Sequence, residues 1–172
     1  GKVYEVKPEM CVIADDARVL GFGGVIGGEE SGCSETTTDV LLECALFDPV
    51  RTHETGRATG IVSDAQYRFA RGVDPGFVVP GIELATRMIL ELCGGEASEL
   101  MVAGAEPAPP APVSFDPDRV RALAGIPVTA ARVRSVLKAL GFEATAEAQG
   151  TKRLKVQPPT WRADVEGPAD LV

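Results

Sequence analysis

The chain has 172 residues, 45% of them hydrophobic, so it is long and apolar enough for one domain core or two smaller ones. Its formal net charge is −8, distributed unevenly, with −9 on residues 1–105 and +1 on residues 106–172. Nucleic-acid affinity comes largely from neutralising phosphates, so the acidic first part is excluded as a general nucleic-acid binder.

The four cysteines and the single histidine form no metal-site pattern. Cys11, Cys33, Cys44 and Cys93 are widely spaced without a C-x-x-C pair, and His53 is the one histidine. We therefore predict no metal ligands, and we interpret the cysteines as buried, reduced thiols of a cytoplasmic protein. No apolar run approaches 18 residues, which predicts neither a membrane span nor a membrane partner.

Residues 10–28 are typical of an antiparallel hairpin. An apolar run ends at Asp15-Asp16, a turn signal, and a second strand interrupted by glycines follows. The glycines do not make a nucleotide site, because Glu29 stands where the Walker lysine belongs and Ile26 occupies the third glycine position of the dinucleotide fingerprint.

The apolar run Val40–Ala45 predicts a buried strand, and Glu43 lies within it. A carboxylate inside such a run is costly unless it is paired or faces a polar pocket. Two interpretations stay open from the residues alone. In the first, Glu43 lies on the solvent face or caps a neighbouring backbone. In the second, it is a pocket carboxylate that accepts a hydrogen bond from a ligand.

Three helices are predicted in the rest of the first part. Asp48-Pro49 begins a helix that ends at Gly60, with His53 on its surface, and Ser63 caps a short helix over 64–69. Residues 80–93 have apolar side chains at helical spacing, and we expect this helix to cover one face of the sheet.

A proline-rich linker over residues 106–113 separates a second unit at 114–172. Asp116-Pro117 begins one helix, with Val120 and Leu123 facing inward, and Thr129 caps a second. Two strands follow, and two helices followed by a β-ribbon is a winged-helix-like order. The apolar face of the second helix is expected to comprise Val133, Val136, Leu137 and Leu140.

The predicted fold class is therefore α+β: a mixed or antiparallel sheet with packed helices, followed by a small winged-helix-like α+β domain. Several motifs occur in a fixed order over nearly the whole chain. They are "VIADD", "GGVIGGEESG", "VLLECALFDP", "SDAQYRFARGVDP" and "LELCGGE", then "DRVRALAG", "LKALGFEA" and "PTWRADV". In this order and at these intervals they resemble the β subunit of bacterial phenylalanyl-tRNA synthetase.

The resemblance implies a division of the chain and a function. Residues 1–105 would be the C-terminal half of the B3/B4 editing and tRNA-binding module, and residues 114–172 a B5 domain that is truncated at its C-terminus. In that family the module hydrolyses tyrosine wrongly attached to tRNA(Phe). An α subunit, in an α2β2 assembly, performs ATP- and Mg2+-dependent aminoacylation, so no cofactor is expected in this part.

The resemblance also implies site residues, carried over by motif. Gly27 matches the floor of the editing pocket, and Glu43 matches the carboxylate that recognises the tyrosine hydroxyl. Ser63 and Ala65 match the Thr-x-Ala wall, with serine in place of threonine. His53 does not match the histidine of the family's pocket, which lies upstream of Gly1.

These matches predict a substrate-binding half-pocket with no catalytic nucleophile or general base, in which an oriented water is the hydrolytic agent. We therefore expect the isolated chain to be inactive in editing. The alternative is a non-catalytic module of the same subunit, used for structure or for nucleic-acid interaction.

Overall fold

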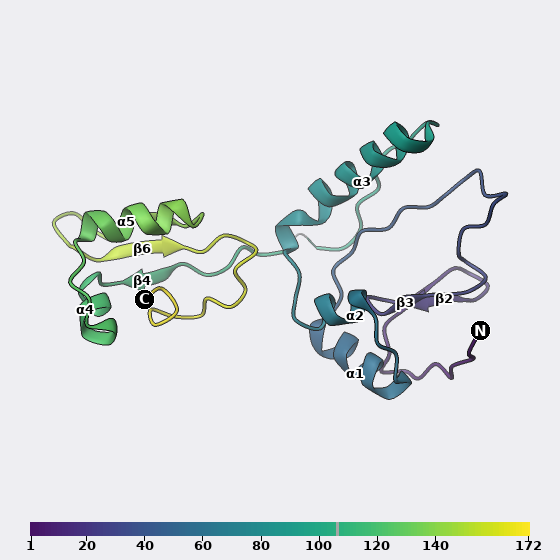
Figure 1. Ribbon diagram of the computed structural model, residues 1–172, viewed down its shortest axis with the longest axis horizontal. Helices are drawn as coiled ribbons and strands as arrows, with labels where there is room; N and C mark the ends of the chain where they lie inside the picture. The colour runs from purple at the N-terminus through teal and green to yellow at the C-terminus, as the bar shows by residue number, and fades with distance from the viewer. Residues whose placement is uncertain (106) are drawn as a thin grey trace. The chain divides into compact units, whose positions relative to one another are not determined.

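The computed structural model describes residues 1–105 and 107–172. The chain forms two compact units, Gly1–Met101 and Val102–Val172, each described here by itself (Figure 1). Both combine helices with a small antiparallel sheet, which confirms the predicted α+β class. The predicted linker begins at residue 106, which lies outside the described residues.

The first unit begins with the predicted hairpin. Strands β1 (Val12–Ala14), β2 (Val19–Phe22) and β3 (Ile26–Gly27) pair in the order β1-β2-β3, each antiparallel to its neighbour. The register sets Phe22 opposite both Val12 and Ile26. The buried core of the unit is small, and its members are Met10, Phe22, Val25 and Ile61.

Helices α1 (Pro49–Thr59) and α2 (Asp64–Phe69) confirm the predicted capping pattern. The Asp48 carboxylate accepts a hydrogen bond from Arg51 N at 2.8 Å, and Ser63 Oγ accepts one from Gln66 N at 3.0 Å. Such caps satisfy the free N–H groups of a first helical turn. His53 is exposed, as predicted.

The buried face of α1 is made of small residues. A side chain on Gly56 would collide with Gln66 of α2, so the two helices pack closely at this point. Thr52 and Thr55 are 0% and 2% exposed, and neither hydroxyl has a hydrogen-bond partner in the described part of the chain. The small size of Gly56 therefore lets Gln66 of α2 pack directly against α1.

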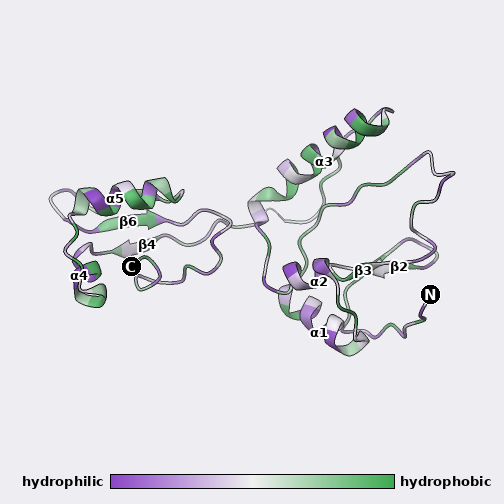
Figure 2. Ribbon diagram, viewed as in Figure 1, coloured by the Kyte–Doolittle hydropathy of each residue, from purple (hydrophilic) through white to green (hydrophobic). Residues whose placement is uncertain are grey.

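Helix α3 (Val78–Cys93) follows a short 3-10 turn, η1 (Pro75–Phe77), and so begins two residues earlier than predicted. The expectation that it covers a sheet face was wrong, because none of its residues is buried. Figure 2 shows long hydrophobic stretches along this helix. Its exposed large apolar side chains are Val79, Leu84, Met88, Leu90 and Leu92.

The predicted buried strand Val40–Ala45 was also wrong. The segment has no strand assignment, and Leu41 is 91% exposed. A strand needs a neighbour to satisfy its backbone groups, and the described residues place none beside this segment. The segment is apolar, as the sequence shows, but an apolar sequence alone does not provide a neighbouring strand.

The second unit contains β4 (Val113–Phe115), α4 (Asp118–Ala124), α5 (Ala130–Ala139), β5 (Glu143–Ala146) and β6 (Leu154–Gln157). The strands form an antiparallel sheet in the order β4-β6-β5. The two helices and the β5–β6 ribbon were predicted. Strand β4 was not, because Val113 follows a proline-rich stretch that indicates an extended chain without partners.

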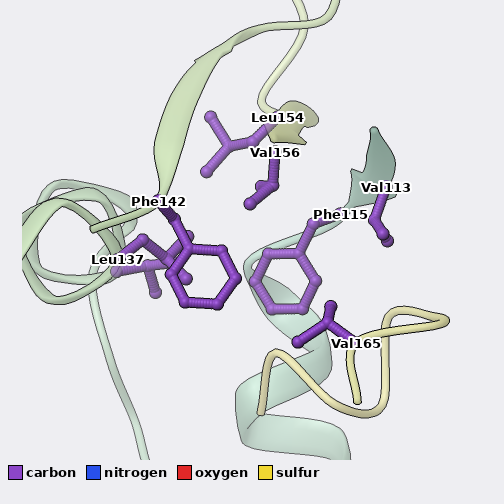
Figure 3. Packing of buried hydrophobic residues seen from close by; sticks show 8 residues of the cluster. Val113, Phe115, Leu137, Phe142, Leu154, Val156 and Val165 are labelled. Atoms are coloured by element: carbon purple, nitrogen blue, oxygen red, sulfur yellow. The ribbon is translucent and has the colours of Figure 1, made fainter. Parts of the chain in front are cut away.

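The sheet of the second unit carries a well-filled core (Figure 3). Phe115, Leu154 and Val156 are fully buried, and Val133 and Leu137 of α5 pack with them. The buried hydrophobic cluster comprises Val113, Phe115, Val133, Leu137, Phe142, Leu154, Val156 and Val165.

Three predictions of inward-facing residues in this unit were wrong. Leu123, Val136 and Leu140 are 57%, 38% and 56% exposed. A short helix on a three-stranded sheet buries only a narrow stripe, so positions at the margin of the apolar face stay in contact with solvent.

The prediction of buried cysteines fails for three of the four. All four thiols are free, but Cys33, Cys44 and Cys93 are exposed and only Cys11 is half-buried. Among the described residues, no helix is both long and apolar enough to cross a membrane.

Candidate functional site

The turn between β2 and β3, residues 23–25, is where the segments that carry the predicted site residues meet. An ideal Cβ on Gly23 would lie 2.6 Å from Phe47, and one on Gly24 would lie 3.0 Å from Phe47 and 3.2 Å from Phe69. Gly24 also has φ of 69°, where a side chain is strained. The rings of Phe47 and Phe69 therefore pack directly against the backbone of Gly23 and Gly24.

Phe47 and Phe69 come from different segments. Their centroids are 5.1 Å apart and their planes are inclined by 70°, an edge-to-face arrangement. Phe69 ends α2, and Phe47 lies four residues after Glu43. The pair thus anchors both the Glu43 segment and α2 at the glycine turn.

Ser63 makes the second connection to this turn. Its hydroxyl donates to the carbonyl oxygen of Val25 at 2.5 Å while it caps α2. Val25 is 1% exposed and lies two residues before Gly27. Ala65, half-buried in the first turn of α2, follows Ser63 by two residues. The structure therefore ties the Ser63–Ala65 segment to the start of β3.

Gly27 differs from the glycines of the turn. Its φ is not positive, and a Cβ built on it would find no atom within 4 Å, so neither backbone strain nor packing inside the described chain requires a glycine. Gly27 is exposed at the end of β3. Glycine without an internal reason is typical of positions that another molecule or another backbone approaches closely.

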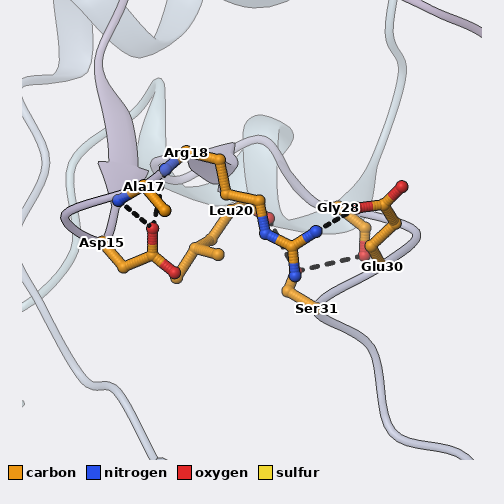
Figure 4. A network of polar contacts seen from close by, with 7 residues as sticks. All are labelled: Asp15, Ala17, Arg18, Leu20, Gly28, Glu30 and Ser31. Carbon is orange, nitrogen blue, oxygen red and sulfur yellow. Dashed lines mark hydrogen bonds and ion pairs between the residues drawn. The ribbon is translucent and has the colours of Figure 1, made fainter.

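The backbone beside Gly27 is held by the polar contacts in Figure 4. Gly28 N and Ser31 Oγ both donate to the carbonyl oxygen of Leu20 at 2.7 Å. Arg18 pairs with Glu30 across the same hairpin. A hollow of about 140 Å³ is lined by Arg18, Val19, Leu20, Gly28, Glu29, Glu30 and Ser31.

Neither that hollow nor a second one of about 230 Å³ includes Gly27, Glu43, Ser63 or Ala65. The second is lined by Glu9, Met10, Glu54, Thr55 and Ala58. The described chain thus brings together two segments of the predicted site as an open surface, and neither of these hollows encloses it.

Glu43 lies on an exposed segment without regular structure. Desolvation by the surrounding protein nevertheless raises the pKa of its carboxyl group above the ordinary value. No hydrogen bond or ion pair joins Glu43 to Gly27, Ser63 or Ala65 within residues 1–105 and 107–172, and its nearest link to them is the Phe47 anchor.

Sequence reasoning missed the residues that join the site segments. No sequence motif marks Phe47, Phe69 or the Val25 carbonyl as part of a site. Aromatic rings and backbone carbonyls occur in every protein, so they give no signal of function. The adjacent pair Gly23-Gly24 was the available signal, since glycine clusters mark close approach by another group.

The residues present do not fit ATP and Mg2+, the cofactors implied for the complete enzyme. The glycine-rich stretch is followed by Glu29 and Glu30, which repel phosphate. The described residues also contain no group of three or more histidine, cysteine, aspartate or glutamate side chains that could hold a metal ion.

Known proteins match both units. The family model of the B3/4 domain matches residues 1–94, and the model of the tRNA synthetase B5 domain matches residues 113–172. The phenylalanine–tRNA ligase beta subunit of Cereibacter sphaeroides is 52% identical over 172 residues. Those of Paramagnetospirillum magneticum and Mesorhizobium japonicum are each 51% identical, over 172 and 173 residues.

These alignments cover 100% of this chain and 20%, 21% and 21% of the three relatives, so the chain spans about a fifth of their length. The similarity is thus continuous through both units. The chain therefore belongs to the family of the phenylalanine–tRNA ligase beta subunit, with a B3/4 domain followed by a tRNA synthetase B5 domain.

Proposed function

We propose that this chain contributes to the hydrolytic editing of tyrosyl-tRNA(Phe) in a cytoplasmic phenylalanine–tRNA ligase, assembled with an α subunit as α2β2. The tyrosine moiety lies over Gly27, beside the segment that carries Ser63 and Ala65. Glu43 accepts a hydrogen bond from its phenolic hydroxyl. The observation that carries the proposal is the open space at Gly27, for which the chain's own packing gives no reason.

The chemistry of the error favours this design. A largely apolar phenylalanine site rejects tyrosine weakly, because an added hydroxyl is worth only about 100-fold in such a pocket. A second site that hydrogen-bonds the hydroxyl binds tyrosine in preference to phenylalanine. Bound phenylalanine would leave the carboxylate of that site without a hydrogen-bond partner. The raised pKa of Glu43 supports a position that is partly shielded from water.

The described chain supplies recognition and positioning. It has no serine–histidine or cysteine–histidine pair for nucleophilic attack, since its one histidine is exposed on α1. A water molecule held by backbone and pocket groups attacks the ester carbonyl carbon, and the bond from that carbon to the ribose oxygen of the tRNA breaks. The ribose oxygen takes the proton that the water gives up, which releases tyrosine and tRNA. We expect residues 1–172 alone to be inactive, because the resemblance implies that the histidine of the pocket lies upstream of Gly1, and His53 does not match it.

The test is deacylation of tyrosyl-tRNA(Phe) by the complete synthetase. Glu43→Ala is expected to slow the reaction roughly 10- to 100-fold, the value of a hydrogen bond to a charged group. Gly27→Val is expected to slow it as strongly without lowering the melting temperature, because the added side chain enters open space.

Glu96→Ala is the matched control, an exposed carboxylate outside the site that is expected to leave deacylation unchanged. The proposal is wrong if the wild-type enzyme does not hydrolyse tyrosyl-tRNA(Phe), or if Glu43→Ala and Gly27→Val both match Glu96→Ala.

A second candidate function concerns the B5 unit. Helix α5 exposes Arg132, Arg134 and Lys138, and none of them forms an ion pair with a described residue. Unpaired basic residues on the second helix of a winged-helix-like unit favour contact with nucleic acid. Neutralising all three should lower both the affinity for tRNA and the salt dependence of binding, whereas a purely structural unit would show no change.

A further inference from the structure

We propose that Ser63 is a positioning residue of the editing site, one that holds the pocket floor through the carbonyl of Val25 and does not contact the tyrosine. The inference rests on the proposed function and adds a mechanism to it. Similarity by motif places Ser63 on the pocket wall, but the hydrogen bonds of its hydroxyl are directed into the protein.

The hydroxyl of Ser63 is already engaged on both sides. A serine hydroxyl has one proton to donate and accepts through two lone pairs. Its proton goes to Val25 O at 2.5 Å, and one lone pair accepts from Gln66 N at 3.0 Å. Ser63 therefore has no proton left for a substrate carbonyl or for an attacking water.

The bond to Val25 matters because β3 is very short. Only two residue pairs, Gly21–Gly27 and Phe22–Ile26, join β3 to β2. Gly28 N to Leu20 O, at 2.7 Å, is the next backbone contact along the chain. The tether from Ser63 fixes the residue immediately before this ladder, and it links the position of Gly27 to the first turn of α2.

The same geometry accounts for the tolerance of serine at a position where the resemblance implies threonine. Both side chains present a hydroxyl on Cβ, and both are favoured at a helix N-cap. The extra methyl of threonine is not needed for either hydrogen bond. Ser63→Thr is therefore expected to behave as the wild type.

The experiment uses the complete synthetase with three substitutions at this position. Ser63→Thr keeps the cap and the donor, and Ser63→Asp keeps a cap acceptor but cannot donate to Val25 O. Ser63→Ala loses both. For each enzyme, kcat and KM for deacylation of tyrosyl-tRNA(Phe), the melting temperature and hydrogen–deuterium exchange of peptides covering residues 20–28 and 64–70 are measured.

Ser63→Asp is expected to keep the wild-type KM and exchange over 64–70. Its melting temperature should fall modestly, because one hydrogen bond is lost and a carboxylate faces the carbonyl oxygen of Val25. The aspartate variant is expected to exchange faster over 20–28 and to lose roughly 10- to 100-fold in kcat, the scale of a misplaced reacting group. Ser63→Thr should match the wild type in every measurement. Ser63→Ala should lose activity like the aspartate variant and also exchange faster over 64–70.

Two results would overturn the positioning role. One is a Ser63→Asp enzyme with wild-type kcat and wild-type exchange over 20–28. The other is a Ser63→Thr enzyme as slow as Ser63→Ala, which would show that the size of the side chain decides. A wild-type enzyme that does not deacylate tyrosyl-tRNA(Phe) rejects the proposed function itself, and with it any catalytic consequence of the tether.

Discussion

The two units differ in how completely they bury their apolar residues. The second unit, with 71 residues, has eight buried hydrophobic side chains around one sheet, whereas the first, with 101 residues, has four. The first unit instead exposes apolar side chains along α3 and along residues 40–46. The second unit therefore has the larger core, and the first combines a small core with helix caps and the close Phe47–Phe69 contact.

The two units also differ in where their candidate binding residues lie. The second unit packs its sheet and α5 around a buried core and keeps the basic residues of α5 on the surface. In the first unit, Gly23 and Gly24 and the Phe47–Phe69 pair form the turn that precedes β3, and Gly27, the proposed floor of a binding site, lies in β3. Loops held by a few specific contacts are where binding residues are commonly found.

The largest expected effect tests the core of the second unit. Phe115 is 0% exposed, so Phe115→Ala should lower the free energy of unfolding of this unit by about 3–5 kcal/mol. Trp161 is the only tryptophan and lies in the same unit, so its fluorescence during urea unfolding reports the change.

Leu41→Ala is the matched substitution in the first unit. Leu41 is 91% exposed, and the expected change is within about 0.5 kcal/mol, measured by circular dichroism. If Leu41→Ala lowered the free energy of unfolding as much as Phe115→Ala does, the contrast between the units would be contradicted.

We expect a smaller loss of stability when either of the glycines that follow α1 and α5 is replaced. Gly60 and Gly141 have φ of 67° and 86°, so alanine at either should cost about 1–2 kcal/mol in unfolding free energy. A Cβ on Gly60 meets nothing, but one on Gly141 would lie 2.7 Å from the ring of Trp161. Only Gly141→Ala should therefore shift the fluorescence maximum of the folded protein. An unchanged spectrum would argue against this contact.

The smallest effect is the pH dependence linked to Glu43. The fold raises the pKa of this carboxyl group, so the folded protein binds its proton more tightly than the unfolded chain does. The resulting stabilisation is present at low pH and is lost as the pH rises through the folded-state pKa. Glu43→Gln should therefore gain stability relative to the wild type as the pH rises above about 4, the ordinary pKa of a glutamate.

Urea unfolding at several pH values measures this difference, with Glu96→Gln as a control for the loss of one exposed charge. A difference between Glu43→Gln and the wild type that falls with rising pH would contradict the direction of the pKa shift.

The sequence predicted the elements whose signals are local. Asp48, Ser63 and Thr129 were assigned as helix caps, and each accepts a backbone hydrogen bond in the structure. Local chemistry of this kind does not depend on distant partners. The antiparallel hairpin of the first unit was found for the same reason, through its turn and glycine signals.

Predictions that required a distant partner failed. The strand at Val40–Ala45 and the sheet-covering role of the helix near residues 80–93 both assumed neighbours that composition cannot supply. In the candidate site, too, local sequence motifs were predicted and tertiary contacts were not. Motifs named Gly27, Glu43, Ser63 and Ala65. The Phe47–Phe69 ring contact and the hydrogen bond from Ser63 to Val25, which organise these segments, depend on tertiary packing.

The small-residue face of α1 has a consequence for protein engineering. Thr52 and Thr55 bury hydroxyl groups without a partner in the described part of the chain, and such groups oppose folding by about 1–3 kcal/mol each. Valine has nearly the shape of threonine and no polar atom. Each of these positions is thus a site where removing an oxygen should strengthen the first unit while its outline stays the same.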